Sequence, residues 1–156
     1  MVTGSNGYQL QPAGIRDLFA LRRLENECFP EDAWPLIDLL GALTLPGITR
    51  LKAVIDQEMV GFVAGSVKAY EKVGWIMTIG VQAVHRRKGI GLALLQACET
   101  HMRAPAVRLC VRRSNQAAIQ LYQNTGYAPV DVWARYYYGG EDALVLEKKF
   151  LMTSGS

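Results

Sequence analysis

One stretch of the chain is more informative than any other, IGVQAVHRRKGIGLALL, which runs from Ile79 to Leu95. The apolar residues at its start predict a strand, and the basic residues 86–88 in its centre predict a turn. The residues from Gly89 onward predict an amphipathic helix. Such a turn directs several backbone N–H groups toward one point, at the positive end of a helix dipole. Gly89 allows an unusual φ angle there, and Gly91 lets a bulky ligand approach the helix start. The stretch therefore predicts an anion site, with a pyrophosphate as its ligand.

Composition indicates an ordinary globular protein. The chain has 156 residues, of which 50% are hydrophobic and 20% charged. We expect one domain with a core of its own at residues 7–151, with residues 1–6 and 152–156 as tails or remnants of cloning. The net charge of +3 is too small to suggest nucleic-acid binding. Basic residues gather instead at 86–88 and 112–113, where a strand meets a helix.

The cysteines and the hydropathy pattern indicate a cellular compartment. Cys28, Cys98 and Cys110 are widely spaced and form no C-x-x-C pair, which is typical of reduced thiols. No apolar run approaches the roughly 20 residues of a membrane span, and no signal-peptide pattern is present. We expect a cytoplasmic protein without a metal site that binds neither nucleic acid nor membrane. We expect it to be a monomer or a weak dimer.

Periodicity predicts the order of helices and strands. Helices are expected at about 15–28, 32–45 (broken near Trp34-Pro35), 89–102 and 115–125. Strands are expected at about 8–12 (at a sheet edge), 49–56, 59–67, 75–81, 106–112, 127–134 and 143–150. This order predicts an α/β (α+β) fold, in which a mixed sheet carries helices on both faces.

A second stretch identifies a family. SNQAAIQLYQNTGY at residues 114–127 resembles a signature of the GNAT acetyltransferases, S-N-x-x-A-x-x-L-Y-x-x-x-G-F/Y. Together with the glycine-containing turn and the order of elements, the resemblance covers residues 8–150. It implies the GNAT fold, a mostly antiparallel central sheet of about seven strands, and transfer of an acetyl group from acetyl-CoA to an amine by direct attack.

Three local features resemble the RimI-type enzymes, which acetylate the N-termini of ribosomal proteins. They are CFPEDAW at 28–34, VRRSN at 111–115, and RYYYGGEDA at 135–143. The resemblance implies that the acceptor is the α-amine of a protein or peptide N-terminus, with a ribosomal protein as one candidate. Two rivals stay open: an enzyme that acetylates a small-molecule amine, and a non-catalytic sensor that binds acyl-CoA.

The family assigns cofactor-binding roles to matching positions. The end of the strand before the turn is expected to carry a bulge, beside which the pantetheine chain pairs. Asn115 is expected either to contact the cofactor or to act only as a helix N-cap. The predicted cofactor-binding residues are Ile79, Gly80, Val81, Arg86, Arg87, Lys88, Gly89, Ile90, Gly91, Asn115 and Tyr122.

The predicted catalytic residues are Tyr122, Glu31 and Cys110. Tyr122 is the candidate general acid, because a phenol with a pKa of about 10 can donate to a departing thiolate with a pKa of about 8.5. Packing in the core is its structural alternative. RimI-type enzymes have a glutamate base at the position of Cys110, and cysteine there is otherwise a small core residue. Glu31 is the second candidate base, with a solvated loop carboxylate as its alternative.

Aromatic residues predict the acceptor site. The resemblance implies that two of the three consecutive tyrosines close over the peptide, and which two stays open by one residue. The alternative is that they fill a hydrophobic edge. The predicted substrate-binding residues are Phe29, Pro30, Trp34, Tyr136, Tyr137 and Tyr138.

Overall fold

The computed structural model describes residues 2–3, 7–68 and 70–151. These residues group into two compact units, and each is described by itself. The first unit comprises Met1–Ser66 and Met77–Met102, and the second comprises Val67–Ile76 and Arg103–Ser156. The expectation of a single domain stays a prediction.

The helices and strands follow the predicted order closely. The helices are α1 (Leu18–Cys28, preceded by a 3-10 turn at Ile15–Asp17), α2 (Leu36–Thr44), α3 (Ile90–Met102) and α4 (Gln116–Asn124). The strands are β1 (Val2–Thr3), β2 (Gln9–Pro12), β3 (Ile48–Ile55), β4 (Glu58–Lys68), β5 (Val73–Val81), β6 (Ala106–Arg112), β7 (Ala128–Trp133) and β8 (Ala143–Lys149).

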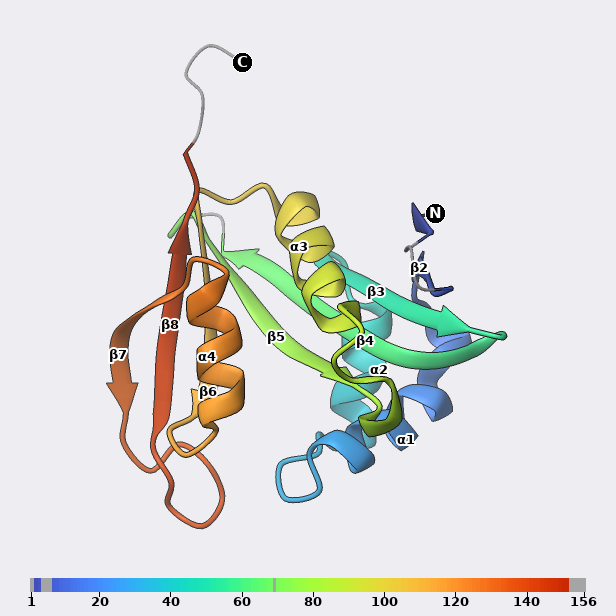
Figure 1. The fold of residues 1–156 in the computed structure, drawn as a ribbon, viewed down its shortest axis with the longest axis horizontal. Coiled ribbons are helices and arrows are strands. Elements are labelled where there is room, and N and C mark those ends of the chain that lie inside the picture. Colours follow the sequence, from blue (N-terminus) through green and yellow to red (C-terminus); the bar gives the residue numbers. More distant parts are fainter. Residues whose placement is uncertain (1, 4–6, 69, 152–156) are drawn as a thin grey trace. The chain divides into compact units, whose positions relative to one another are not determined.

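The strands are hydrogen-bonded in the order β1-β2-β3-β4-β5-β6-β8-β7 (Figure 1). β5 and β6 are parallel, whereas the pairs β1–β2, β2–β3, β3–β4, β6–β8 and β7–β8 are antiparallel. The predicted fold class, a mixed and mostly antiparallel sheet with helices, is therefore confirmed. None of the helices in the described part of the chain has the length and apolar character that a membrane span requires.

Two details of the sequence prediction are wrong. Residues 1–6 are not only a tail, because Val2 and Thr3 pair with Leu10 and Gln9, so that β2 is not the edge strand. The second helix begins at Leu36 rather than at residue 32. Pro35 has an extended ψ of 152°, so the helix cannot begin before it. Proline also disfavours helical geometry in the residue before it, here Trp34, and this keeps the preceding turn out of the helix.

The first unit has helices on both faces of β4 (Figure 1). Phe62 belongs to a buried cluster with residues of α1 and α2. The neighbouring Gly61 points to the other face, where a Cβ atom would lie 2.9 Å from Cδ1 of Leu94 on α3. Alternation along the strand thus separates two apolar layers, which positions the start of α3 beside the end of β5. The buried members of the cluster are Leu21, Leu24, Leu39, Leu43, Met59, Phe62 and Ala64.

The second unit is built around the antiparallel pair β6–β8. Val107, Leu109 and Val111 of β6 are buried, as the alternation in the sequence predicts. β6 pairs with β8 over its whole length, from Ala106 with Lys149 to Arg112 with Ala143. This register brings the start of β8 beside the chain segment that leads from β6 into α4.

Candidate active site

The turn before α3 has the geometry of an anion cradle. Arg87 and Gly89 both have positive φ angles, 64° and 81°, so the backbone there is left-handed at alternate residues. Such a backbone turns successive N–H groups toward one side. The N–H of Ala93 donates to the carbonyl of Gly89, which makes Ala93 the first residue whose amide bonds within the helix. The amides of residues 89–92 precede that bond and are available for a ligand.

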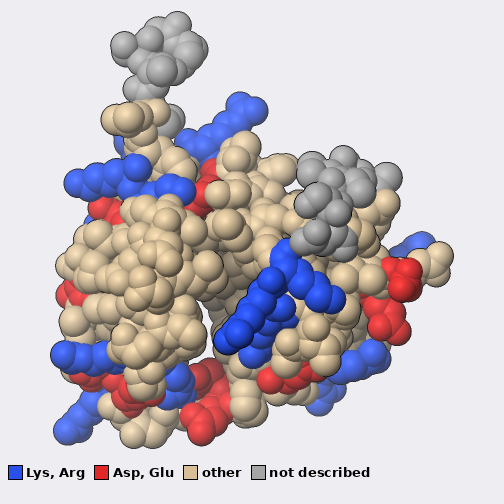
Figure 2. Space-filling view, in the orientation of Figure 1, with Lys and Arg blue, Asp and Glu red and all other residues tan. Residues whose placement is uncertain are grey.

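Glycine keeps the approach to this cradle open. Among the described residues, no atom lies within 4 Å of the Cβ position of Gly89, and the one neighbour of that position at Gly91 is Cγ2 of Val81 at 3.6 Å. Arg87 and Lys88 are exposed beside it, and Figure 2 shows basic side chains gathered near the start of α3. Ile90, by contrast, is 1% exposed and packs in the core, so that it can offer a ligand only its backbone. A negatively charged group therefore fits the cradle both sterically and electrostatically.

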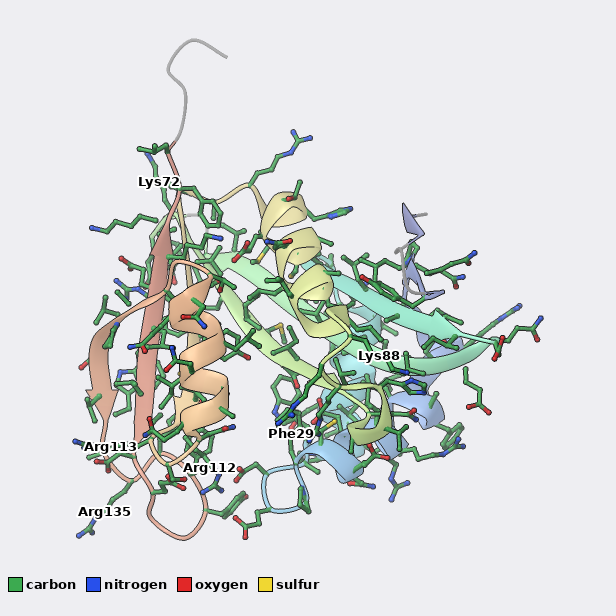
Figure 3. All side chains as sticks on the ribbon, viewed as in Figure 1. Phe29, Lys72, Lys88, Arg112, Arg113 and Arg135 are labelled. Carbon is green, nitrogen blue, oxygen red and sulfur yellow. The ribbon has the colours of Figure 1, made fainter. Side chains whose placement is uncertain are left out.

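Arg86 lies differently from the other two basic residues of the turn. Its Nε donates to the carbonyl of Val81 at 2.9 Å, and Nη2 lies 3.8 Å from Sγ of Cys28. Lys88, labelled in Figure 3, has its Nζ 3.3 Å from Nδ1 of His85. Arg86 thus holds the end of β5, and the charges that face outward at the cradle come from Arg87 and Lys88.

Two neighbouring residues near the end of β5 contact the helices α1 and α2. Met77 lines a pocket with residues of α2, and Thr78, the next residue, donates a hydrogen bond to Glu25 on α1. Successive residues of a regular strand point to opposite faces, so two neighbours that both face the layer of α1 and α2 indicate an interruption. The bulge expected from the sequence at Ile79, Gly80 and Val81 stays a prediction.

The end of α1 packs closely against β5. A Cβ atom on Gly80 would lie 3.0 Å from Sγ of Cys28 and 3.4 Å from the ring of Phe29. The thiol of Cys28 lies 3.5 Å from the carbonyl of Val81, and the Glu27 carboxylate accepts from the amide of Ala83. A side chain at position 80 would therefore force Cys28 or Phe29 to shift, and glycine avoids that cost. The structure brings the predicted residues Phe29, Gly80 and Val81 together.

The loop after α1 holds the remaining predicted residues of the first unit. Pro30 and Glu31 are exposed in a turn, which the amide of Asp32 closes by donating to the carbonyl of Phe29 at 3.1 Å. Trp34 is partly buried and lines an apolar pocket of about 380 Å³. The other residues that line the pocket are Ile37, Asp38, Gly41, Ala42, Leu45, Ile48 and Met77.

The second unit holds Tyr122 and Cys110. Burial raises the pKa of Tyr122 to about 12, and its ring packs edge-on against that of Tyr127 at 5.9 Å. Burial also raises the pKa of Cys110 to about 11, so its thiol is neutral at physiological pH. A neutral thiol is a poor base, which favours the reading of Cys110 as a small residue of the strand. The side chain of Asn115 accepts from the amide of Ala118 at 3.2 Å, as the N-cap of α4.

Four aromatic rings form a continuous row in the second unit. Trp75 stacks on Trp133 at 5.5 Å, Trp133 contacts Tyr136 at 5.4 Å, and Tyr136 packs edge-on against Tyr137 at 5.0 Å. Tyr138 is 80% exposed and points into solvent. The tyrosines that pack as a pair are therefore Tyr136 and Tyr137, and which two of the three correspond to the family pair stays open.

Cys110 lies close to this aromatic row. The pKa of Tyr136 is raised mainly by burial and, to a smaller extent, by the Cys110 thiol.

The two tryptophans were missed as site residues, because nothing in their local sequence shows that β5 and β7 would bring them together. A buried carboxylate, Glu25, was also missed. Its signal was its place on the apolar stripe of α1, four residues after Leu21 and three before Cys28.

The titratable residues give no sign of a metal centre. Among the residues that the structure describes, no three His, Cys, Asp or Glu side chains lie close enough to hold a metal ion together.

Comparison with known proteins shows similarity along almost the whole chain. Residues 17–127 match the model of the acetyltransferase (GNAT) family. The chain is 33% identical over 146 residues to the N-terminal acetyltransferase A complex catalytic subunit NAA10 of Arabidopsis thaliana, covering 89% of this chain and 76% of the relative. It is 31% identical over 153 residues to an N-alpha-acetyltransferase of Sulfurisphaera tokodaii, covering 89% and 91%. The crystal structure of the ribosomal-protein-S18-alanine N-acetyltransferase from Escherichia coli superposes with a TM-score of 0.85 at 22% identity, covering 96% of this chain and 97% of that chain.

Proposed function

The chain belongs to the acetyltransferase (GNAT) family, and we propose that it transfers an acetyl group from acetyl-CoA to the α-amine of a protein or peptide N-terminus. The observation that carries the cofactor half of this proposal is the left-handed turn at Arg87 and Gly89, which opens into α3. The acceptor half rests on the relatives that are 31–33% identical, whose names describe N-terminal or N-alpha acetylation.

The turn before α3 binds the pyrophosphate of the cofactor. Backbone amides of residues 89–92 donate to its oxygens, and the helix dipole adds a partial positive charge. Arg87 and Lys88 contribute full charges from the exposed side of the turn. The bound cofactor supplies an acetyl group that is already activated as a thioester.

The end of β5 binds and polarises the acyl end of the cofactor. We propose that an interruption of the pleat between Met77 and Thr78 frees backbone groups near Ile79 to pair with a ligand. Those groups pair with the pantetheine chain, and one amide donates to the thioester carbonyl. A donor held in place before the reaction costs no reorganisation when negative charge develops on that oxygen.

Tyr122 donates to the departing thiolate. Its raised pKa of about 12 keeps the hydroxyl protonated at every physiological pH, so the donor is always present. A phenol with this pKa is a weaker acid than the thiol that forms, whose pKa is about 8.5. Tyr122 therefore acts chiefly as a hydrogen-bond donor that stabilises the thiolate, and solvent completes the proton transfer.

The demand for a base is small if the acceptor is an α-amine. With a pKa of about 7.7–8.0, roughly a tenth of such amines are neutral at pH 7, and losing the proton costs about 1 kcal/mol. A lysine side chain, with a pKa near 10.4, would cost more than 4 kcal/mol. Glu31, exposed in the turn after α1, is the candidate that assists this step, since Cys110 is a neutral thiol. The site therefore suits α-amines better than lysines.

Each unit holds aromatic side chains that we propose bind the acceptor peptide. In the second unit these are Tyr136 and Tyr137, with Tyr138 exposed beside them. In the first unit they are Phe29 and Trp34, with Pro30 between them in the sequence. A ribosomal protein as the acceptor, a cytoplasmic location and a monomeric or weakly dimeric state remain predictions.

The proposal is tested by following thiol release from acetyl-CoA with a panel of short peptides. The panel contains peptides with free N-termini, the same peptides with an acetylated N-terminus and an internal lysine, and common polyamines. We expect turnover on free N-termini only. Turnover on polyamines alone would instead identify a small-amine acetyltransferase, and tight binding of CoA with no turnover on any amine would identify a sensor.

A further inference from the structure

The loop between β7 and β8, residues 134–142, is attached to the start of α4 by two acidic residues. Glu141 and Asp142 end this loop, whereas Arg112 ends β6 and is followed by Arg113 and Ser114. In Figure 3, Arg112, Arg113 and Arg135 lie at the same end of the second unit. The contacts between these two segments form a structure that we call the acidic clip.

Glu141 bridges the loop and the helix with the two oxygens of one carboxylate. Oε1 accepts from Nη1 of Arg112 at 2.9 Å, and Oε2 accepts from the backbone amide of Ser114 at 2.7 Å. Ser114 directly precedes Asn115, the N-cap of α4, and α4 carries Tyr122. A single side chain thus joins the aromatic loop to the helix that holds the proposed proton donor.

The same two residues also position Tyr137. The guanidinium of Arg112 lies over the Tyr137 ring, with 4.7 Å between Cζ and the ring centroid. The amide of Tyr137 donates to the backbone carbonyl of Glu141 at 3.1 Å. Arg112 in addition reaches the carbonyl of Tyr138 at 3.5 Å. Tyr137 is therefore held at its backbone by Glu141 and at its ring by the partner of Glu141.

Asp142 attaches the other end of the loop. Its Oδ1 accepts from the amide of Arg135 at 3.1 Å, and Oδ2 lies 3.3 Å from Nη1 of Arg113. Its carbonyl accepts from the amide of Arg113 at 3.1 Å. Arg135 has a φ angle of 53°, a left-handed conformation that is costly for a residue with a side chain. The hydrogen bond that the Arg135 amide donates to Asp142 offsets that cost and joins the two ends of the loop.

From these contacts we propose that Glu141 is a positioning residue, which holds Tyr137 ready for the acceptor peptide through Arg112. This inference rests on the proposed function and deepens it. A loop that is fixed before the peptide arrives loses little conformational freedom on binding, which favours affinity for the acceptor. The aromatic loop is then a preformed wall of the peptide site, and Glu141 contributes to peptide binding without touching the peptide.

The charge of Glu141 persists across the range in which the acceptor amine titrates. The pKa of Glu141 is lowered by two hydrogen bonds that its carboxylate accepts. The larger effect comes from Ser114 and the smaller from Arg112. The groups that face it are Arg112 and, through the neighbouring ion pair, Arg113 and Asp142. The clip is therefore intact throughout neutral and mildly acidic pH, and changes of rate with pH near 8 do not arise from it.

The experiment compares E141Q with the unaltered protein in steady-state kinetics on a free-N-terminus peptide. The glutamine side chain has the same shape as that of glutamate but lacks the negative charge that holds Arg112. We expect KM for the peptide to rise about tenfold, while KM for acetyl-CoA and kcat stay within about twofold. R112K keeps the positive charge but loses the planar fork, and we expect the same selective rise in peptide KM from it.

Asp17 provides a matched control in the first unit. Its carboxylate also bridges a backbone amide, that of Gly14 at 2.9 Å, and a cation, Lys52 at 2.8 Å. D17N therefore removes the same kind of contact, with a similar loss of stability, from a place outside the proposed site. Its peptide KM should equal that of the unaltered protein.

Hydrogen exchange measured by mass spectrometry provides a readout that needs no activity. In E141Q the amides of residues 134–142 and of Ser114 should exchange faster, whereas in D17N they should not. Unchanged exchange in the loop, or an unchanged peptide KM, would overturn the inference while the proposed function stands. Absence of turnover by the unaltered protein on every free N-terminus would overturn the proposed function, and the role in peptide binding with it.

Discussion

The hydroxyl of Thr78 on β5 donates to Oε1 of Glu25 on α1 at 2.6 Å, and both residues are at least 92% buried, with exposures of 8% and 3%. The second oxygen of Glu25 is also buried and has no hydrogen-bond partner among the described residues. Burial raises the pKa of Glu25, while the bond from Thr78 acts in the opposite direction and is the smaller effect. A carboxyl group under the interrupted end of β5 thus favours its neutral form.

This relationship predicts how stability depends on pH. A carboxyl whose pKa is raised on folding stabilises the folded state below its unfolded pKa, about 4.3, and that contribution is lost as the pH rises through the folded pKa. E25Q stays neutral at every pH. The free energy of unfolding of the unaltered protein should therefore fall relative to that of E25Q as the pH rises from 4 to 8.

Urea denaturation at several pH values measures this difference. E58Q, which alters an exposed carboxylate at the start of β4, is the control and should show no such trend. A difference between E25Q and the unaltered protein that stays constant with pH would show that Glu25 has an ordinary pKa.

The cradle before α3 predicts a selective effect on the cofactor. G89A places a side chain at a φ angle of 81°, and G47A does the same at a φ angle of 80° in the turn before β3. Since neither position has a neighbour within 4 Å, both variants should lose roughly 1 kcal/mol of stability from backbone strain alone. Only G89A should raise KM for acetyl-CoA, by about tenfold, because the strain would displace the backbone amide that we propose donates to the pyrophosphate.

Thermal denaturation and steady-state kinetics separate the two effects. Equal KM values for acetyl-CoA in G89A and G47A would place the pyrophosphate elsewhere.

The donor role of Tyr122 predicts a loss of turnover without loss of binding. Y122F removes the hydroxyl but keeps the ring that packs against Tyr127. We expect kcat to fall about 100-fold, with KM for acetyl-CoA unchanged within about twofold. Because the pKa of Tyr122 is about 12, the unaltered enzyme should show no decline of kcat from this residue below pH 10. A Y127F variant, which alters the partner ring, is the control; equal losses in both variants would indicate a role in packing only.

The pKa of Cys110, about 11, predicts that its thiol is not the base. C110S should change kcat/KM by less than about twofold between pH 6 and pH 9, and the rate should rise with pH through the pKa of the amine, about 7.7–8.0. C110E, by contrast, introduces a carboxylate beside Tyr136 and should raise the rate below pH 7, where most of the amine is protonated. A tenfold loss in C110S would assign the thiol a catalytic role after all.

Local signals were sufficient for much of the fold. The 3.6-residue period of α1 and α3, the alternation in β6 and the N-cap at Asn115 each depend on neighbours within a few residues, and all three predictions are confirmed. The positive φ angle at Gly89 was likewise expected from the sequence. These features are readable because backbone preferences are set by the residue itself and by those beside it.

Errors arose where neighbours from elsewhere in the chain intervene. The pairing of Val2 with Leu10 could not be foreseen, since a two-residue segment carries no period. The start of α2 was placed too early because the apolar pattern continues through Trp34, while Pro35 restricts the backbone before it.

The sequence by itself determined the family, the order of the elements and the cradle, because these depend on spacing along the chain. Only the tertiary structure decided which side chains meet. Thr78 reaches Glu25 across 53 residues, and Arg112 reaches Glu141 across 29. The first contact requires β5 to lie correctly against α1, and the second requires β6 and β8 to pair in the right register. No local backbone preference specifies either arrangement. The raised pKa of Glu25 follows from its burial, and the fixed position of Tyr137 follows from the contact of Arg112 with Glu141, so both belong to the fold rather than to the sequence pattern.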